Sequence, residues 1–128
     1  MAYFADLTPY SYIRRLAEPN VVNVGWLDSQ HIFPKGQAPA AVLAKVFALC
    51  REPVNLARGM HRCQFCPEPT FGYIAERDGI KIGLGSGEIR VKGLLGIEYA
   101  SPTMIYHYMN DHSYLPPQEF LEAISKNK

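Results

Sequence analysis

The chain has 128 residues, with 13 Lys and Arg against 12 Asp and Glu. This length suits one domain, and we expect a single domain over residues 1–128. The net charge of +1 provides no long-range attraction toward nucleic acid or an anionic membrane, so both partners are disfavoured. The longest apolar stretch, Ala38 to Cys50, is too short to cross a bilayer, and the N-terminus lacks a signal-peptide pattern. We therefore expect a cytoplasmic protein.

The first half of the chain predicts two helices around one strand. Thr8-Pro9 is a cap-plus-proline start for a short helix that ends near Leu16. The β-branched run from Asn20 to Leu27 predicts a strand, and a Pro/Gly loop follows from Ser29 to Ala38. Pro39 opens a helix that reaches Cys50. Its apolar residues recur with helical spacing on one face: Val42, Leu43, Val46, Phe47 and Cys50.

The second half predicts strands followed by helices. Thr70 to Glu76, Ile80 to Leu84 and Glu88 to Tyr99 are typical of strands joined by short turns, and an antiparallel meander is the simplest result. Ser101-Pro102 predicts a helix to about Asn110, and Pro116-Pro117 opens a last one. The order predicts an α+β fold: a three- to four-stranded, mainly antiparallel sheet, about four helices and a zinc-stapled loop.

The three cysteines and one histidine form the pattern Cys-x10-His-x-Cys-x2-Cys, with Cys50, His61, Cys63 and Cys66 as its members. Thiolate and imidazole are preferred zinc ligands, and four of them make a closed structural site. The segment from Pro53 to Pro69 shows turn chemistry without periodicity, so it needs something to order it. We therefore predict a structural Zn2+ as the cofactor.

Other interpretations of this cluster stay open. Cys50 can be a buried helix cysteine, and Cys63-x2-Cys66 alone can be a redox dithiol. Without Cys50, the remaining His/Cys/Cys set matches the ligands of nucleobase deaminases, whose zinc is catalytic. Those enzymes carry Glu two residues after the histidine, where this chain has Cys63. A catalytic zinc is thus the alternative to a structural one.

The C-terminal part carries an aromatic, imidazole-rich stretch with His107 and His112. Five residues apart, two side chains lie about 140° apart around a helix, so one helix does not present both histidines as ligands. The neighbouring tyrosines are expected to pack the helix with their polar tips outward.

Two sets of residues carry a resemblance to an uncharacterised family of small bacterial proteins. The first is Arg58-Gly59-x-His61-x-Cys63-x2-Cys66. The second is the tail His107-Tyr108-x3-His112-x-Tyr114-x-Pro116-Pro117-x-Glu119-Phe120. In size and architecture such proteins are similar to the immunity proteins that accompany bacterial toxins, which is an analogy at the level of the fold.

Because the four-ligand zinc site is closed and no acid–base pair can be identified, we expect a non-enzymatic, zinc-stabilised protein that binds a cognate protein partner, most concretely a toxin that it neutralises. Its interface is expected on residue types common in hot spots, namely Arg58, Arg62, Tyr106, Tyr108 and Tyr114. The alternatives are a zinc-dependent hydrolase or deaminase and a small nucleic-acid-binding protein.

Overall fold

The computed structural model describes residues 3–10, 20–54, 63–66 and 73–126. Within them the chain forms an α+β fold, as predicted, and this fold has five strands and three α-helices. The strands are β1 (Val21–Asn23), β2 (Tyr73–Arg77), β3 (Ile80–Leu84), β4 (Glu88–Lys92) and β5 (Glu98–Pro102). The helices are α1 (Ala40–Cys50), α2 (Ile105–Asp111) and α3 (Gln118–Lys126), with a short 3-10 turn at Leu94–Gly96.

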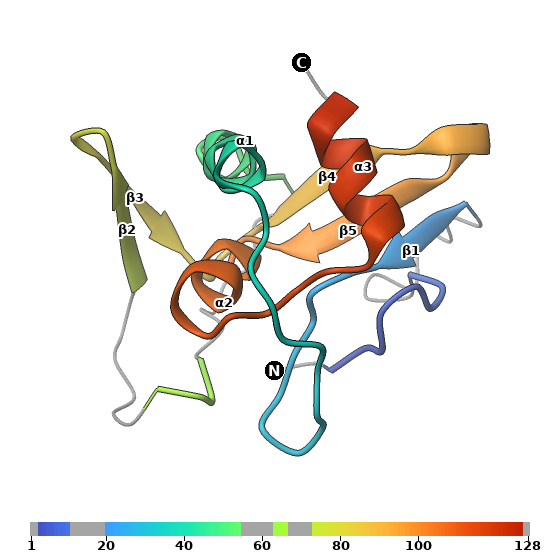
Figure 1. Cartoon of the computed structure of the whole chain (residues 1–128), viewed down its shortest axis with the longest axis horizontal. Coiled ribbons are helices and arrows are strands. Elements are labelled where there is room, and N and C mark those ends of the chain that lie inside the picture. Colours follow the sequence, from blue (N-terminus) through green and yellow to red (C-terminus); the bar gives the residue numbers. More distant parts are fainter. Residues whose placement is uncertain (1–2, 11–19, 55–62, 67–72, 127–128) are drawn as a thin grey trace.

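The strands form two separate sheets, not one meander. β4 pairs with β5 in antiparallel fashion, and β1 adds to the other edge of β5 as a parallel strand. β2 and β3 make an antiparallel hairpin of their own, which Figure 1 shows apart from the three-stranded sheet. The expected pairing of β3 with β4 is therefore wrong: β4 is an edge strand of the three-stranded sheet, whereas β3 pairs with β2 in the other sheet.

The predicted strand from Glu88 to Tyr99 divides at Gly93 and Gly96. The turn between them reverses the chain, so that Val91 pairs with Tyr99 across the β4–β5 hairpin. Gly96 has φ 77°, a conformation that glycine adopts without a steric cost. One long pattern of β-forming residues thus encodes two strands.

Four helix starts were predicted from proline, and two of these predictions are confirmed. Pro39 precedes α1 and Pro117 precedes α3, as expected. Pro9 instead makes a β-bridge with Val22, and the rest of the helix predicted there lies outside the described residues. Pro102 ends β5, where it pairs with Glu88, and α2 begins only at Ile105.

The core lies where the three helices pack together and against β4. α1 contacts both α2 and α3, and α1 and α3 also contact β4. The largest fully buried side chains include Tyr108, Tyr114 and Phe120, all from the C-terminal part of the chain. This packing fixes the position of α2, on which the candidate site depends. Among the described residues, no helix combines the length and apolar composition needed to cross a membrane.

Candidate metal centre

Cys63 and Cys66 lie in a short turn that packs against the core. Cys63 is buried, and its backbone N–H donates a hydrogen bond to the Tyr73 hydroxyl at 3.2 Å. Between the two cysteines, the Phe65 ring makes edge contacts with Phe33 and Tyr108. These contacts anchor the turn, so both thiols have defined positions.

The end of α2 supplies two histidines. His107 lies within the helix, and His112 follows its last residue with φ −122° and ψ 10°. Ser113 then takes a left-handed conformation with φ 57°, which ends the helix. The two Nε2 atoms lie 3.2 Å apart. We expected that one helix would not present both histidines as ligands. They nevertheless meet, because His112 lies just past the end of α2, where helical spacing no longer applies.

The two thiols and two imidazoles converge on one point. The Sγ of Cys63 lies 3.2 Å from Nε2 of His112, and the Sγ of Cys66 lies 3.3 Å from Nε2 of His107. All four donor atoms lie within 4.8 Å of one another. Zinc bonds of about 2.0–2.3 Å in a tetrahedron place neighbouring ligand atoms about 3.3–3.8 Å apart. The cluster therefore has dimensions that can hold a metal ion.

A carboxylate orients one of the histidines. The Oδ2 of Asp111 lies 3.1 Å from Nδ1 of His107, one helical turn away. This contact places the proton of the neutral ring on Nδ1 and leaves the lone pair of Nε2 directed at the cluster. Metal-binding histidines commonly have such a partner on the second nitrogen.

Burial changes the protonation of the cluster in the absence of a cation. It lowers the pKa of His107, which keeps the imidazole neutral and able to donate its lone pair. Burial is also the main reason that the pKa of Cys63 rises to about 11. A divalent cation stabilises the thiolate directly, so metal binding at neutral pH displaces the thiol proton.

The sequence-based ligand set and this cluster share Cys63 and Cys66. Cys50 is buried in α1, and its Sγ donates to the carbonyl of Thr103 at 3.6 Å, so the structure places it in the core and not in the cluster. Burial raises the pKa of this thiol to about 12. His61 lies outside the described residues.

The predicted partner-binding residues are three tyrosines, which the structure describes, and two arginines, which it does not. Tyr106, Tyr108 and Tyr114 are all buried. Their burial contradicts both the expectation that their polar tips face outward and the expectation that they form an exposed interface. The Tyr114 hydroxyl, for example, donates to the Asp6 carboxylate at 2.8 Å inside the fold. Arg58 and Arg62 lie outside the described residues.

The chain belongs to a protein family described as a domain of unknown function, DUF7919, which matches residues 2–125. This agrees with the resemblance to an uncharacterised family. Searches of curated proteins and of solved structures found no match.

Proposed function

We propose that the protein binds one Zn2+ through Cys63, Cys66, His107 and His112, and that this zinc is a structural part of a non-enzymatic binding protein. The observation that carries the proposal is the convergence of four soft or borderline ligand atoms within 4.8 Å. Thiolate and imidazole favour zinc over calcium and magnesium, which prefer oxygen ligands.

A structural role is favoured over a catalytic one by the number of protein ligands. Four side chains complete a tetrahedral zinc site, whereas catalytic sites have three and bind water at the fourth position. Asp111 is bonded to the nitrogen of His107 that points away from the cluster, so it orients a ligand and does not face a zinc-bound water. These features disfavour the hydrolase and deaminase alternatives.

The proposed zinc joins parts of the chain that have little else in common. Cys63 and Cys66 come from a short irregular segment, whereas both histidines come from α2 and the residue that follows it. Because the four ligands meet only in the folded chain, the energy of zinc binding adds to the stability of the fold. Zinc thus fixes the turn at residues 63–66 on the helical core.

Elemental analysis of the purified protein tests the proposal. We expect about one zinc per chain in the wild type, and loss of zinc in His112→Ala and Cys66→Ser. His31→Ala is the matched control, because the ring of His31 stacks on Tyr3 and its Nδ1 contacts Asp28. Wild-type protein that folds normally with less than about a tenth of an equivalent of zinc contradicts the proposal.

The partner is proposed to be a cognate protein, specifically a toxin that this protein neutralises. This part of the proposal is supported by small size, an α+β fold and a metal site closed by four protein ligands. A toxin gene beside this one identifies the candidate. Co-expression then restores growth, and the two proteins purify together at a fixed ratio; growth inhibition that co-expression leaves unchanged contradicts this role.

A further inference from the structure

The three cysteines of the chain differ in exposure. Cys50 is 2% exposed and Cys63 is 3% exposed, whereas Cys66 is only half-buried. The Sγ of Cys50 donates to the Thr103 carbonyl at 3.6 Å, and burial raises the pKa of this thiol to about 12. The thiolate is the reactive form of cysteine. Cys50 is therefore inert, and Cys66 is the sulfur that a dissolved reagent meets first.

Cys63 and Cys66 are close enough to react with each other. Their Sγ atoms belong to the group of donor atoms that all lie within 4.8 Å of one another, and a side-chain hydrogen bond joins the two thiols. Two residues separate them in the turn, which is the spacing of the cysteine pairs that form disulfides in oxidoreductases. A disulfide bond of about 2.05 Å therefore requires only a local adjustment of this turn.

A surface pocket gives small reagents access to the cluster. It has a volume of about 540 Å³, and its lining includes His112 and Phe65, which lies between the two cysteines in the sequence. The Nε2 of His112 lies 3.5 Å from the Sγ of Cys66, so the pocket borders the Cys66 side of the cluster. A peroxide is little larger than a water molecule and can enter it.

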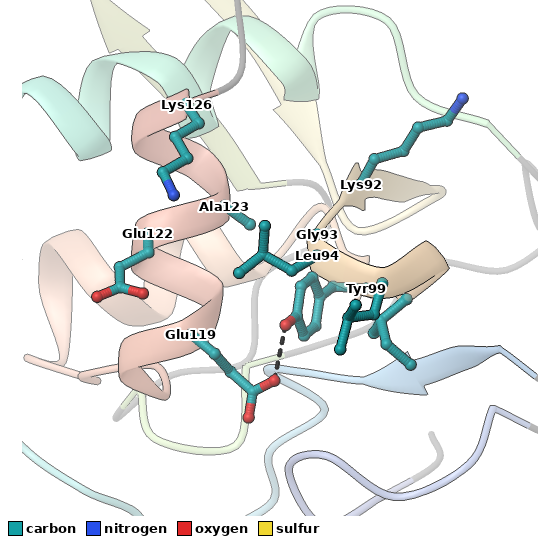
Figure 2. A pocket seen from close by; sticks show the side chains of 10 residues that line it. Lys92, Gly93, Leu94, Tyr99, Glu119, Glu122, Ala123 and Lys126 are labelled. Atoms are coloured by element: carbon teal, nitrogen blue, oxygen red, sulfur yellow. Dashed lines mark hydrogen bonds between the residues drawn. The ribbon is translucent and has the colours of Figure 1, made fainter.

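The helices are held together by contacts outside the cluster. The Tyr99 hydroxyl donates to the carboxylate of Glu119 at 2.7 Å, which Figure 2 shows as a dashed line joining β5 to α3. The buried Phe120 ring makes an edge contact with the Tyr99 ring, and α1 packs on both α2 and α3. These contacts do not use the four ligands. We therefore expect the helices to stay packed when the bonds between zinc and sulfur break.

From these features we infer that Cys63 and Cys66 form an oxidation site, at which a peroxide converts the two thiolates into a disulfide and zinc is released. The inference rests on the proposed function, because it starts from zinc-bound thiolates. The sulfur of Cys66 attacks one oxygen of hydrogen peroxide: a sulfur–oxygen bond forms, the oxygen–oxygen bond breaks and hydroxide leaves. The sulfur of Cys63 then attacks that of Cys66, so that the disulfide forms and a second hydroxide leaves.

The release of zinc follows from the balance of this reaction. The two sulfurs together give two electrons to the peroxide, and its two hydroxides take protons from the solvent to become water. The two thiolate charges are lost, and His107 and His112 alone provide fewer ligands than the three or four of a protein zinc site. The ion therefore leaves as hydrated Zn2+.

Treatment of the zinc-loaded wild type with excess hydrogen peroxide tests the inference. A chromophoric chelator too weak to strip the untreated protein measures zinc release, and we expect two thiols to be lost for each zinc. The wild type has three cysteines, so one thiol, that of Cys50, remains to be counted after denaturation. The control Cys50→Ser should lose both of its thiols and release zinc at the same rate. Mass spectrometry of the digested wild type should identify a disulfide between Cys63 and Cys66, and a phosphine reductant with added zinc should restore the site.

The outcomes separate this inference from the zinc proposal. Untreated, folded protein that contains no zinc overturns both, and so does loss of the two thiols while zinc stays bound. Zinc that stays bound beside three intact thiols, under conditions that oxidise free glutathione, overturns the oxidation site alone. Oxidation that consumes Cys50, or that yields sulfinic acid without a disulfide, overturns it as well, because Cys63 and Cys66 then do not react as a reversible pair.

Discussion

The cluster of thiols and imidazoles and the carboxylates of Glu88 and Asp6 both place polar groups inside the fold, but these groups find their partners in different ways. The Tyr10 hydroxyl lies 2.8 and 2.9 Å from the two oxygens of the Glu88 carboxylate, to which it donates its proton. Asp6 accepts hydrogen bonds from the Gly25 N–H at 3.0 Å and from the Tyr114 hydroxyl at 2.8 Å. In both cases the chain itself supplies hydrogen-bond donors to a carboxylate, which is buried for Glu88 and half-buried for Asp6, and segments distant in sequence are joined without a metal ion.

At the cluster the chain brings together four side chains that are all lone-pair donors once the thiols ionise. Neutral thiols are weak hydrogen-bond donors and acceptors, so they stabilise such a contact poorly without a cation. The comparison teaches that one polar region is complete within the chain, whereas the other gathers four side chains that could hold a metal ion. Their responses to metal removal and to mutation should therefore differ.

The largest effect is expected from Cys63→Ser. Structural zinc contributes about 10–16 kcal/mol of apparent binding energy in zinc-finger peptides, so loss of one thiolate should lower the free energy of unfolding by several kcal/mol. Cys50→Ser is the matched control, because Cys50 is equally buried but lies in the core. It should cost about 1–3 kcal/mol and retain zinc. Denaturant unfolding with and without a chelator measures both. A chelator effect in Cys63→Ser as large as in the wild type speaks against the ligand assignment.

Tyr10→Phe tests the carboxylate region. Removing the hydroxyl takes a hydrogen-bond donor from Glu88, which is only 2% exposed, and should cost about 1–3 kcal/mol without loss of zinc. In the control Tyr99→Phe the affected carboxylate belongs to Glu119, which is exposed and can bind water instead. Its cost should be about 0.5–1.5 kcal/mol. Equal costs for the two variants, measured by denaturant unfolding, contradict the importance of burial at Glu88.

Asp111→Asn tests a residue that orients the proposed ligand His107 and is not itself a ligand. Loss of the carboxylate beside Nδ1 of His107 should weaken zinc binding by about 10–100-fold while the fold remains intact. Asp78→Asn is the control, because Asp78 lies in the β2–β3 turn and asparagine tolerates its φ of 51°. Competition with a chromophoric chelator gives both affinities. An unchanged zinc affinity in Asp111→Asn argues that the contact does not orient the ring.

The smallest effect concerns pH. Burial raises the pKa of Asp6 in the folded chain, so the folded state holds this proton more tightly than the unfolded state does. The stabilising contribution is present at low pH and is lost as pH rises through the raised pKa. Asp6→Asn removes this titration and keeps an acceptor for the Gly25 N–H.

The wild type should therefore lose stability relative to Asp6→Asn as pH rises from about 4 to 7. The difference between the two proteins at each pH cancels the titration of the zinc ligands. A difference that is constant with pH shows that Asp6 does not titrate as described.

Half of the metal cluster was predictable from local sequence, because Cys63 and Cys66 form a short motif. Cys50 was assigned through its closeness in sequence, and the structure places it in the core. His112 was missed because helical periodicity was applied beyond the end of α2. The later Pro116-Pro117 pair required the chain to leave the helix, but the residue at which it does so depends on tertiary packing.

In the fold, too, features set by a local sequence pattern were predictable, whereas contacts between distant segments were not. Periodicity predicted α1 at Pro39 with its bounds, since an apolar face is a local pattern. The parallel pairing of β1 with β5 joins Val21 to Glu98, and no local sequence pattern in either strand predicts it. Three tyrosines expected to expose their polar tips are buried, because partners such as Asp6 and Arg77 come from distant parts of the chain.

The ligand separation bears on the order of events during folding. Cys66 and His107 lie 41 positions apart, and Cys63 and His112 lie 49 apart. Because a loop this long must close before the four ligands meet, we expect zinc to reach its native geometry after α2 has docked and after the rate-limiting step. Interactions that are absent from the transition state slow unfolding and leave the folding rate nearly unchanged. The proposed zinc is then expected to set how long the folded chain persists, whereas packing of the apolar core is expected to set the folding rate.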